Sequence, residues 1–142
     1  MPELPISQGI KDLLTDDGGV SDWTIEVGVM PKTPDKVIMV SDTGQGADPN
    51  PKWLLDFPTV QVMTRGAVSD YLATWAIYKA VKDILLGLTS QSVNSDNWNA
   101  VNITGDLGFI GRDEINRPLF SVNFQLIVEP QVPTGTSNRT AL

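Results

Sequence analysis

The sequence predicts an α+β fold, a single-domain sandwich in which a short N-terminal helix and one long helix pack on a mostly antiparallel or mixed sheet of about five strands. Apolar residues recur at helical spacing in two segments and alternate with polar residues at strand spacing in others. Of the 142 residues, 41% are hydrophobic and 19% charged, a composition typical of one globular domain. We expect the domain to span residues 1–129. Residues 130–142 are dominated by Pro, Gly, Thr, Ser and Asn, and we expect them to form a flexible tail.

Two segments carry the helical pattern. The apolar face of the first consists of Ile6, Ile10, Leu13 and Leu14, and acidic and glycine residues end it at 16–19. The second covers residues 67–88, which as a helix would be about 33 Å long. Its apolar stripe consists of Val68, Tyr71, Leu72, Trp75, Tyr78, Val81, Ile84, Leu85 and Leu88. We therefore expect a helix that crosses the whole sheet with this stripe facing the core.

Five segments are typical of strands, three before the long helix and two after it. They cover residues 23–30, 36–41, 60–65, 98–104 and 120–128. The short connection between the first two predicts an antiparallel hairpin. The remaining segments predict connections: a long loop at 42–52, a polar loop at 89–97 and glycine-rich turns at 105–116. A loop as long as 42–52 in a small domain is usually functional or mobile.

Missing residue types exclude several classes of function. The chain has no cysteine and no histidine, which excludes disulfides, thiolate nucleophiles, histidine-ligated zinc and Ser-His-Asp catalysis. The net charge of -7 argues against a dedicated nucleic-acid binder, which needs a dominant basic face. No segment is long and apolar enough to cross a membrane, and the first residues show no basic region followed by an apolar run, so we expect no secretory signal. We expect no cofactor, no metal and no membrane partner.

One short motif suggests an enzyme of a different class. Asp42-Thr43-Gly44 follows an apolar segment, as in retroviral-type aspartic proteases, and Phe109-Ile110-Gly111-Arg112 resembles their later apolar-apolar-Gly stretch. Catalysis would need two Asp42 side chains, one from each of two subunits, sharing a proton to activate water. Asp-Thr-Gly is also a common strand-ending turn, and a match of three residues is weak evidence for a protease. The long helix between the two motifs disagrees with an all-β protease. We therefore expect no enzymatic activity and keep the protease as an alternative.

Five marks, taken in order, resemble one protein family. They are Met30-Pro31-x-x-Pro34-Asp35, the apolar strand ending in Asp42-Thr43-Gly44, Pro58-Thr59-Val60-Gln61-Val62-x-x-Arg65-Gly66, Gly108-Phe109-Ile110-Gly111-Arg112-Asp113-Glu114, and Arg117-Pro118-x-Phe120-Ser121-x-Asn123-Phe124. Over about residues 30–128 the chain resembles the tail terminator (minor capsid) proteins of long-tailed bacteriophages. The resemblance implies a small α/β sandwich. It also implies a hexameric ring that caps the head-proximal end of the tail tube, ends tube growth and provides the surface for head joining.

The resemblance also implies a place and a set of partners. It indicates a virion protein of the tail or neck that assembles in the cytoplasm of the bacterial host. Its partners would be copies of itself in a homohexamer, the tail tube protein, a head-completion or neck protein, and genomic DNA passing through the ring. An acidic ring would let DNA pass without binding it if the negative charge faces the channel. A head-completion or neck ring protein is the alternative within the same class.

Candidate interface residues are charged and polar groups of the long loop and of the strand ends. They are Asp42, Gln45, Asp48, Lys52, Arg65, Arg112, Asp113 and Arg117. Arginines at strand ends often bond carboxylates across a subunit contact, and an internal ion pair with Asp113 or Glu114 is an equal alternative. If the arginines serve assembly, Arg65→Ala or Arg112→Ala will weaken ring formation or docking more than folding.

Overall fold

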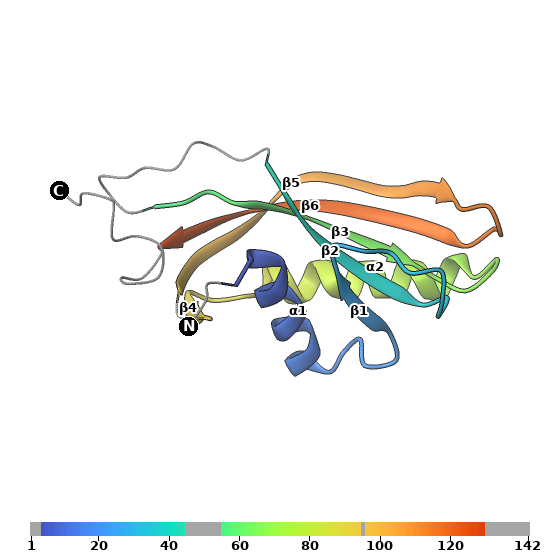
Figure 1. Cartoon of the computed structure of the whole chain (residues 1–142), viewed down its shortest axis with the longest axis horizontal. Helices are drawn as coiled ribbons and strands as arrows, with labels where there is room; N and C mark the ends of the chain where they lie inside the picture. The colour runs from blue at the N-terminus through green and yellow to red at the C-terminus, as the bar shows by residue number, and fades with distance from the viewer. Residues whose placement is uncertain (1–3, 45–54, 95, 130–142) are drawn as a thin grey trace.

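The computed structural model describes residues 4–44, 55–94 and 96–129, and it has two helices and one six-stranded sheet (Figure 1). The helices are α1 (Ile6–Asp17) and α2 (Tyr71–Leu86). The strands are β1 (Thr24–Val27), β2 (Val37–Thr43), β3 (Thr59–Arg65), β4 (Gln91–Val93), β5 (Asp96–Arg112) and β6 (Pro118–Glu129). The predicted α+β class is confirmed, with six strands in place of about five. The added strand, β4, lies where we expected a polar loop.

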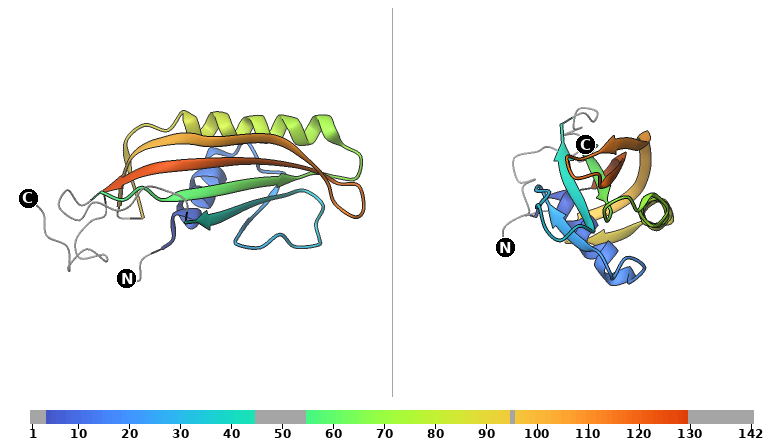
Figure 2. Two further views of the ribbon diagram at one scale, coloured as in Figure 1. Left: turned by 90° about the horizontal axis from the view of Figure 1, so that it is seen from above. Right: turned by 90° about the vertical axis from the view of Figure 1, so that its right-hand side faces the viewer.

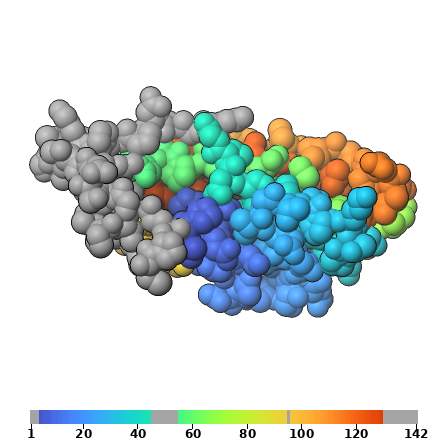
Figure 3. All heavy atoms as spheres, in the orientation of Figure 1, coloured from blue at the N-terminus to red at the C-terminus, as the bar shows by residue number. Residues whose placement is uncertain are grey.

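The sheet is mixed, with strand order β1-β2-β3-β6-β5-β4. Val62 in β3 lies between Val40 of β2 and Val122 of β6, and every neighbouring pair except β1–β2 is antiparallel. α1 packs on β1 and β2, whereas α2 packs on β6, β3 and β5. Seen from its end, the sheet is curled, and α2 lies beside β5 (Figure 2). Figure 3 shows α1 and the β1–β2 connection on the same side of the molecule, next to β2.

One apolar core fills the space between the sheet and both helices. Its largest fully buried side chains are Phe120, Phe124, Ile10, Leu14, Ile38, Leu85 and Leu126. Burying each such side chain stabilises the fold by about 1.5–3 kcal/mol relative to leaving it in water. β6 contributes every second residue to this core from a position in the middle of the sheet, so the predicted alternation over residues 120–128 is confirmed.

The predicted antiparallel hairpin of the first two strands is wrong, because β1 and β2 are parallel. Thr24 lies opposite Val37, and Val27 lies opposite Val40. A four-residue strand is about 13 Å long, and the connecting residues 28–36 can span about 30 Å when extended. The connection is therefore long enough to return the chain to the start of β1, which a hairpin turn does not do.

The glycine-rich turns expected at residues 105–116 are also mostly absent, because β5 continues to Arg112. Its pairing with β6 shifts register between Ile103 and Gly105, between Asp106 and Gly108, and between Phe109 and Gly111. Gly108 and Gly111 have φ angles of 64° and 123°, which favour glycine. The glycines thus mark β-bulges, which bend a strand and increase its twist.

α2 is shorter than expected at both ends. The Asp70 carboxylate accepts a hydrogen bond from the Ala73 backbone N–H at 3.3 Å and caps the first turn. Gly66, just after β3, lies so close to α2 that an added Cβ would stand 1.6 Å from the Thr74 hydroxyl oxygen. The buried face of α2 is narrow and consists of Thr74, Tyr78, Val81 and Leu85. Much of the predicted apolar stripe therefore faces solvent.

Candidate functional site

Arg117 and Asp113 lie together in the connection between β5 and β6. The Arg117 Nε donates to Asp113 Oδ2 at 2.6 Å, and its Nη1 donates to Asp35 Oδ1 at 3.2 Å and to the Lys32 carbonyl at 2.7 Å. Arg117 is only 7% exposed. Its guanidinium therefore holds the β1–β2 connection against the end of the sheet, which agrees with the internal ion-pair alternative.

Arg65 ends β3 beside this group and is 3% exposed. Its guanidinium donates to two backbone carbonyls of the β1–β2 connection, those of Pro34 at 2.7 Å and Asp35 at 3.1 Å. Burial lowers the pKa of Arg65, and the nearby positive charge of Arg117 lowers it further. Both buried arginines thus stabilise one subunit from within.

Hydrogen bonds stabilise the ionised form of the Asp113 side chain. Burial would raise the pKa of this carboxyl. The backbone N–H and the side chain of Arg117 and the backbone N–H of Ile115 all donate to the carboxylate, and together they hold the pKa of Asp113 below its usual value. Asp113 therefore organises the turn between β5 and β6 as a charged carboxylate.

Asp42 lies in β2, and its side chain caps the first turn of α1. It and Thr43 are part of β2 and pair with β3, so Asp42 lies within a paired strand, whereas the protease alternative expects it in a turn. The Asp42 carboxylate accepts hydrogen bonds from the Ser7 backbone N–H at 3.1 Å and from the Ser7 hydroxyl at 2.7 Å. Because Pro5 provides no side-chain cap, Asp42 caps α1 from the neighbouring strand.

Other predicted interface residues lie elsewhere. Gln45, Asp48 and Lys52 fall outside the described residues. Arg112 ends β5, and its exposed guanidinium lies over the Phe109 ring with its carbon 5.1 Å from the centroid. Of the five predicted residues that the structure describes, it brings together Arg65, Asp113 and Arg117.

The strongest surface feature is apolar, and we call it the α2–β5 face. It consists of Tyr71, Leu72 and Trp75 of α2, Phe109 of β5, and the Arg112 guanidinium over Phe109. Leu72 is 78% exposed and Trp75 is 45% exposed. The Tyr71 and Phe109 rings meet edge to face with centroids 5.1 Å apart, which joins the helix and strand parts of the face. Nearby in sequence, Val68, Leu107, Ile110 and Ile115 are also exposed.

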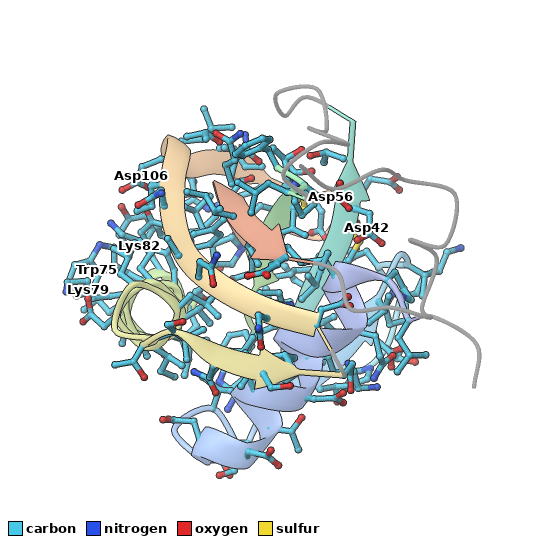
Figure 4. The ribbon with its side chains drawn as sticks, turned by 90° about the vertical axis from the view of Figure 1, so that its left-hand side faces the viewer. Asp42, Asp56, Trp75, Lys79, Lys82 and Asp106 are labelled. Atoms are coloured by element: carbon cyan, nitrogen blue, oxygen red, sulfur yellow. The ribbon has the colours of Figure 1, made fainter. Side chains whose placement is uncertain are left out.

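Two acidic side chains beside this face are paired with lysines within the subunit. Lys79 bonds Asp83 at 2.7 Å on α2, and Lys82 bonds Asp106 of β5 at 2.6 Å. Figure 4 shows Trp75, Lys79, Lys82 and Asp106 on one side of the molecule and Asp42 on the opposite side, beside β2. Within the part of the chain that is described, Arg112 forms no ion pair. The face therefore presents apolar surface and one free cation.

The sequence analysis missed this face because it assigned the whole helical stripe to the core. The sequence did contain a signal for the face, because the apolar stripe is wider than the arc of a helix that packs on a sheet. Positions 74, 78, 81 and 85 already form one complete buried arc of α2. Leu72, Trp75 and Leu86 lie outside that arc, so the helix carries more apolar surface than one packed face uses.

Residues 4–44, 55–94 and 96–129 contain no group of three or more acidic side chains placed to hold a metal ion. No helix in those ranges is long and apolar enough to cross a membrane.

A family model described as bacteriophage tail terminator protein matches residues 12–130. No curated protein matches the chain. The matched segment includes the second half of α1, α2, all six strands and therefore the whole α2–β5 face.

Proposed function

The chain belongs to the bacteriophage tail terminator family, and we propose that this structural protein of the phage tail forms a homohexameric ring at the head-proximal end of the tail tube. There the ring ends tube growth and provides the surface to which the filled head joins. The proposed partners are copies of the same chain, the tail tube protein and a head-completion or neck protein, brought together in the host cytoplasm. The family match over residues 12–130 is the observation that carries the proposal.

The surface of the subunit supports assembly into a ring. A closed ring needs two different complementary surfaces on each subunit, because its contacts are head to tail. The α2–β5 face exposes aromatic and aliphatic side chains that a monomer gains nothing by exposing. In addition, among the described residues β4 pairs with β5 only from Asp96 to Trp98, so most of the outer edge of β5 has no strand beside it.

The net charge of -7 supports passage of DNA through the ring. Acidic side chains that face a channel repel phosphates, so the DNA end would move through without being held. An assembled channel lined mainly by lysine and arginine would contradict this part of the proposal.

Tail length tests the function. In lysates of a phage that lacks this protein, we expect tubes longer than the normal tail, without heads, when they are viewed by electron microscopy. Adding the purified protein during tube assembly restores a uniform length. Tubes of normal length that fail only to join heads would contradict a terminator and favour the head-completion alternative.

A further inference from the structure

We propose that the α2–β5 face is one half of the contact between neighbouring subunits, so that its occupant is a second copy of this chain. The inference rests on the proposed ring and adds to it the surface by which two copies meet. Three properties of the face support it: its side chains, the packing of its aromatic rings and its charge.

The side chains of the face are those that dominate protein interfaces. Tyr, Trp and Arg are enriched among the residues that contribute most to binding, and contacts between identical subunits are more apolar than the average surface. The face combines Tyr71, Trp75 and Arg112 with Leu72, which is 78% exposed in the single subunit. A neighbour that covers Leu72 and Trp75 removes this apolar surface from water.

Two aromatic rings of the face are already packed in the single subunit. The rings of Tyr71 and Phe109 both pack on the buried Phe120, with centroid distances of 5.2 and 5.5 Å. Asp70 caps the first turn of α2, from which Leu72 projects. Because the Tyr71 and Phe109 rings are already packed on Phe120, holding them in a contact costs less entropy than ordering the same rings at a mobile surface.

Charge favours a second copy as the occupant. Two chains with a net charge of -7 repel each other unless they meet where negative charge is neutralised. Beside the face, Asp83 and Asp106 are paired with lysines, and Arg112 adds an unpaired cation. Elsewhere the surface carries exposed acids, as at Asp16, Asp17 and Asp22. The α2–β5 face is thus suited to receive an acidic neighbour.

Crosslinking in assembled tails identifies the occupant. Because the chain contains no cysteine, Leu72→Cys introduces the only thiol, to which a benzophenone photo-crosslinker is attached. We expect an adduct of twice the subunit mass. The matched control is Leu86→Cys, at the other end of α2 and 46% exposed, which we expect to give at least tenfold less of this adduct. An adduct with the tube or head-completion protein, no adduct, or equal self-adduct from both positions would overturn the inference.

A second pair of variants separates the inference from the proposed function. In the variant Leu72→Gln/Trp75→Gln we expect an unchanged unfolding temperature and at least a tenfold loss of rings by native mass spectrometry, whereas Leu86→Gln forms rings as the wild type does. If the double variant forms rings normally, the inference fails, because the face is then not needed for subunit contact. The proposed function, which depends on the wild type, still stands. This holds even if the variant rings no longer stop tube growth. If the wild type neither forms rings nor stops tube growth, the proposed function itself fails.

Discussion

The carboxylate of Asp42 accepts hydrogen bonds from both the backbone N–H and the hydroxyl of Ser7, 35 residues earlier in the chain. The first turn of a helix leaves N–H groups without partners, and Pro5 at the N-cap offers no side chain to accept them. Asp42 therefore supplies from β2 the cap that α1 does not carry in its own sequence. This contact connects α1 to the sheet at the helix end, whereas apolar packing connects it along its length.

We predict that Asp42→Ala lowers the free energy of unfolding by about 1–2 kcal/mol, which is typical for the loss of a helix cap. Urea denaturation of Asp42→Ala, Ser7→Ala and the double variant measures the coupling between the two residues. Asp42→Asn keeps one acceptor oxygen and should lose less stability. Because Ser7→Ala keeps its backbone N–H, simple additivity of the two alanine substitutions would show that the hydrogen bond from the Ser7 hydroxyl to Asp42 contributes nothing.

Replacing a buried arginine should lower the free energy of unfolding more than replacing an exposed one. Arg117→Ala leaves Asp113 without its buried partner and should cost about 3 kcal/mol of unfolding free energy. Arg65→Ala should resemble it, because its guanidinium is also buried on internal carbonyls. Arg112→Ala removes an exposed cation over Phe109 and should cost about 0.5–1 kcal/mol.

Ring formation should reverse this order. Arg112 belongs to the α2–β5 face. Arg112→Ala should therefore lower the yield of rings, measured by native mass spectrometry, while it changes the free energy of unfolding only slightly. A loss of stability as large as that of Arg117→Ala would instead place Arg112 among the residues that fold the subunit.

The pH dependence of stability should depend in part on Asp113. Hydrogen bonds hold its pKa in the folded protein below the ordinary value of 3.8, so the unfolded chain binds this proton first as pH falls. Its contribution is complete above pH 3.8 and is lost as pH falls through the lower folded pKa. The stability difference between the wild type and Asp113→Asn, measured by urea denaturation, should therefore shrink with acid below that value. A difference independent of pH would contradict this role.

The close approach of β3 and α2 predicts a steric effect. In Gly66→Ala the new Cβ would stand 1.6 Å from the Thr74 hydroxyl oxygen, so the end of β3 or the first turn of α2 must move. We expect a loss of about 3 kcal/mol of unfolding free energy. Gly44→Ala is the matched control, because it also follows a strand and no atom of the described residues lies within 4 Å of the new Cβ. Thermal unfolding that leaves both variants unchanged would contradict the close contact.

The spacing of apolar residues predicted which segments form helices and strands wherever that depends only on the segment itself. The alternation in β6 and the helical spacing in α1 required only the residues themselves, and both elements are present. The direction of β1 relative to β2 depends on where residues 28–36 run, which their composition does not encode. The glycines of β5 indicate a departure from regular backbone, and only the partner strand decides whether that departure is a turn or a bulge.

The site was harder to predict because the packing of elements far apart in the sequence determines which side chains are buried. Arg65 and Arg117 have the residue type of an interface, but the returning β1–β2 connection covers them. Trp75 has the residue type of a core, but the arc of α2 that packs on the sheet does not include it. A sequence shows that a side chain is charged or apolar, and the packing of distant elements decides which one meets solvent.

Native mass spectrometry of the protein at rising concentration, alone and bound to preformed tail tubes, tests the central claim most directly. The account predicts a six-subunit species, either free or released from the tube end. A tight dimer, or monomers that remain single in the presence of tubes, would contradict the ring.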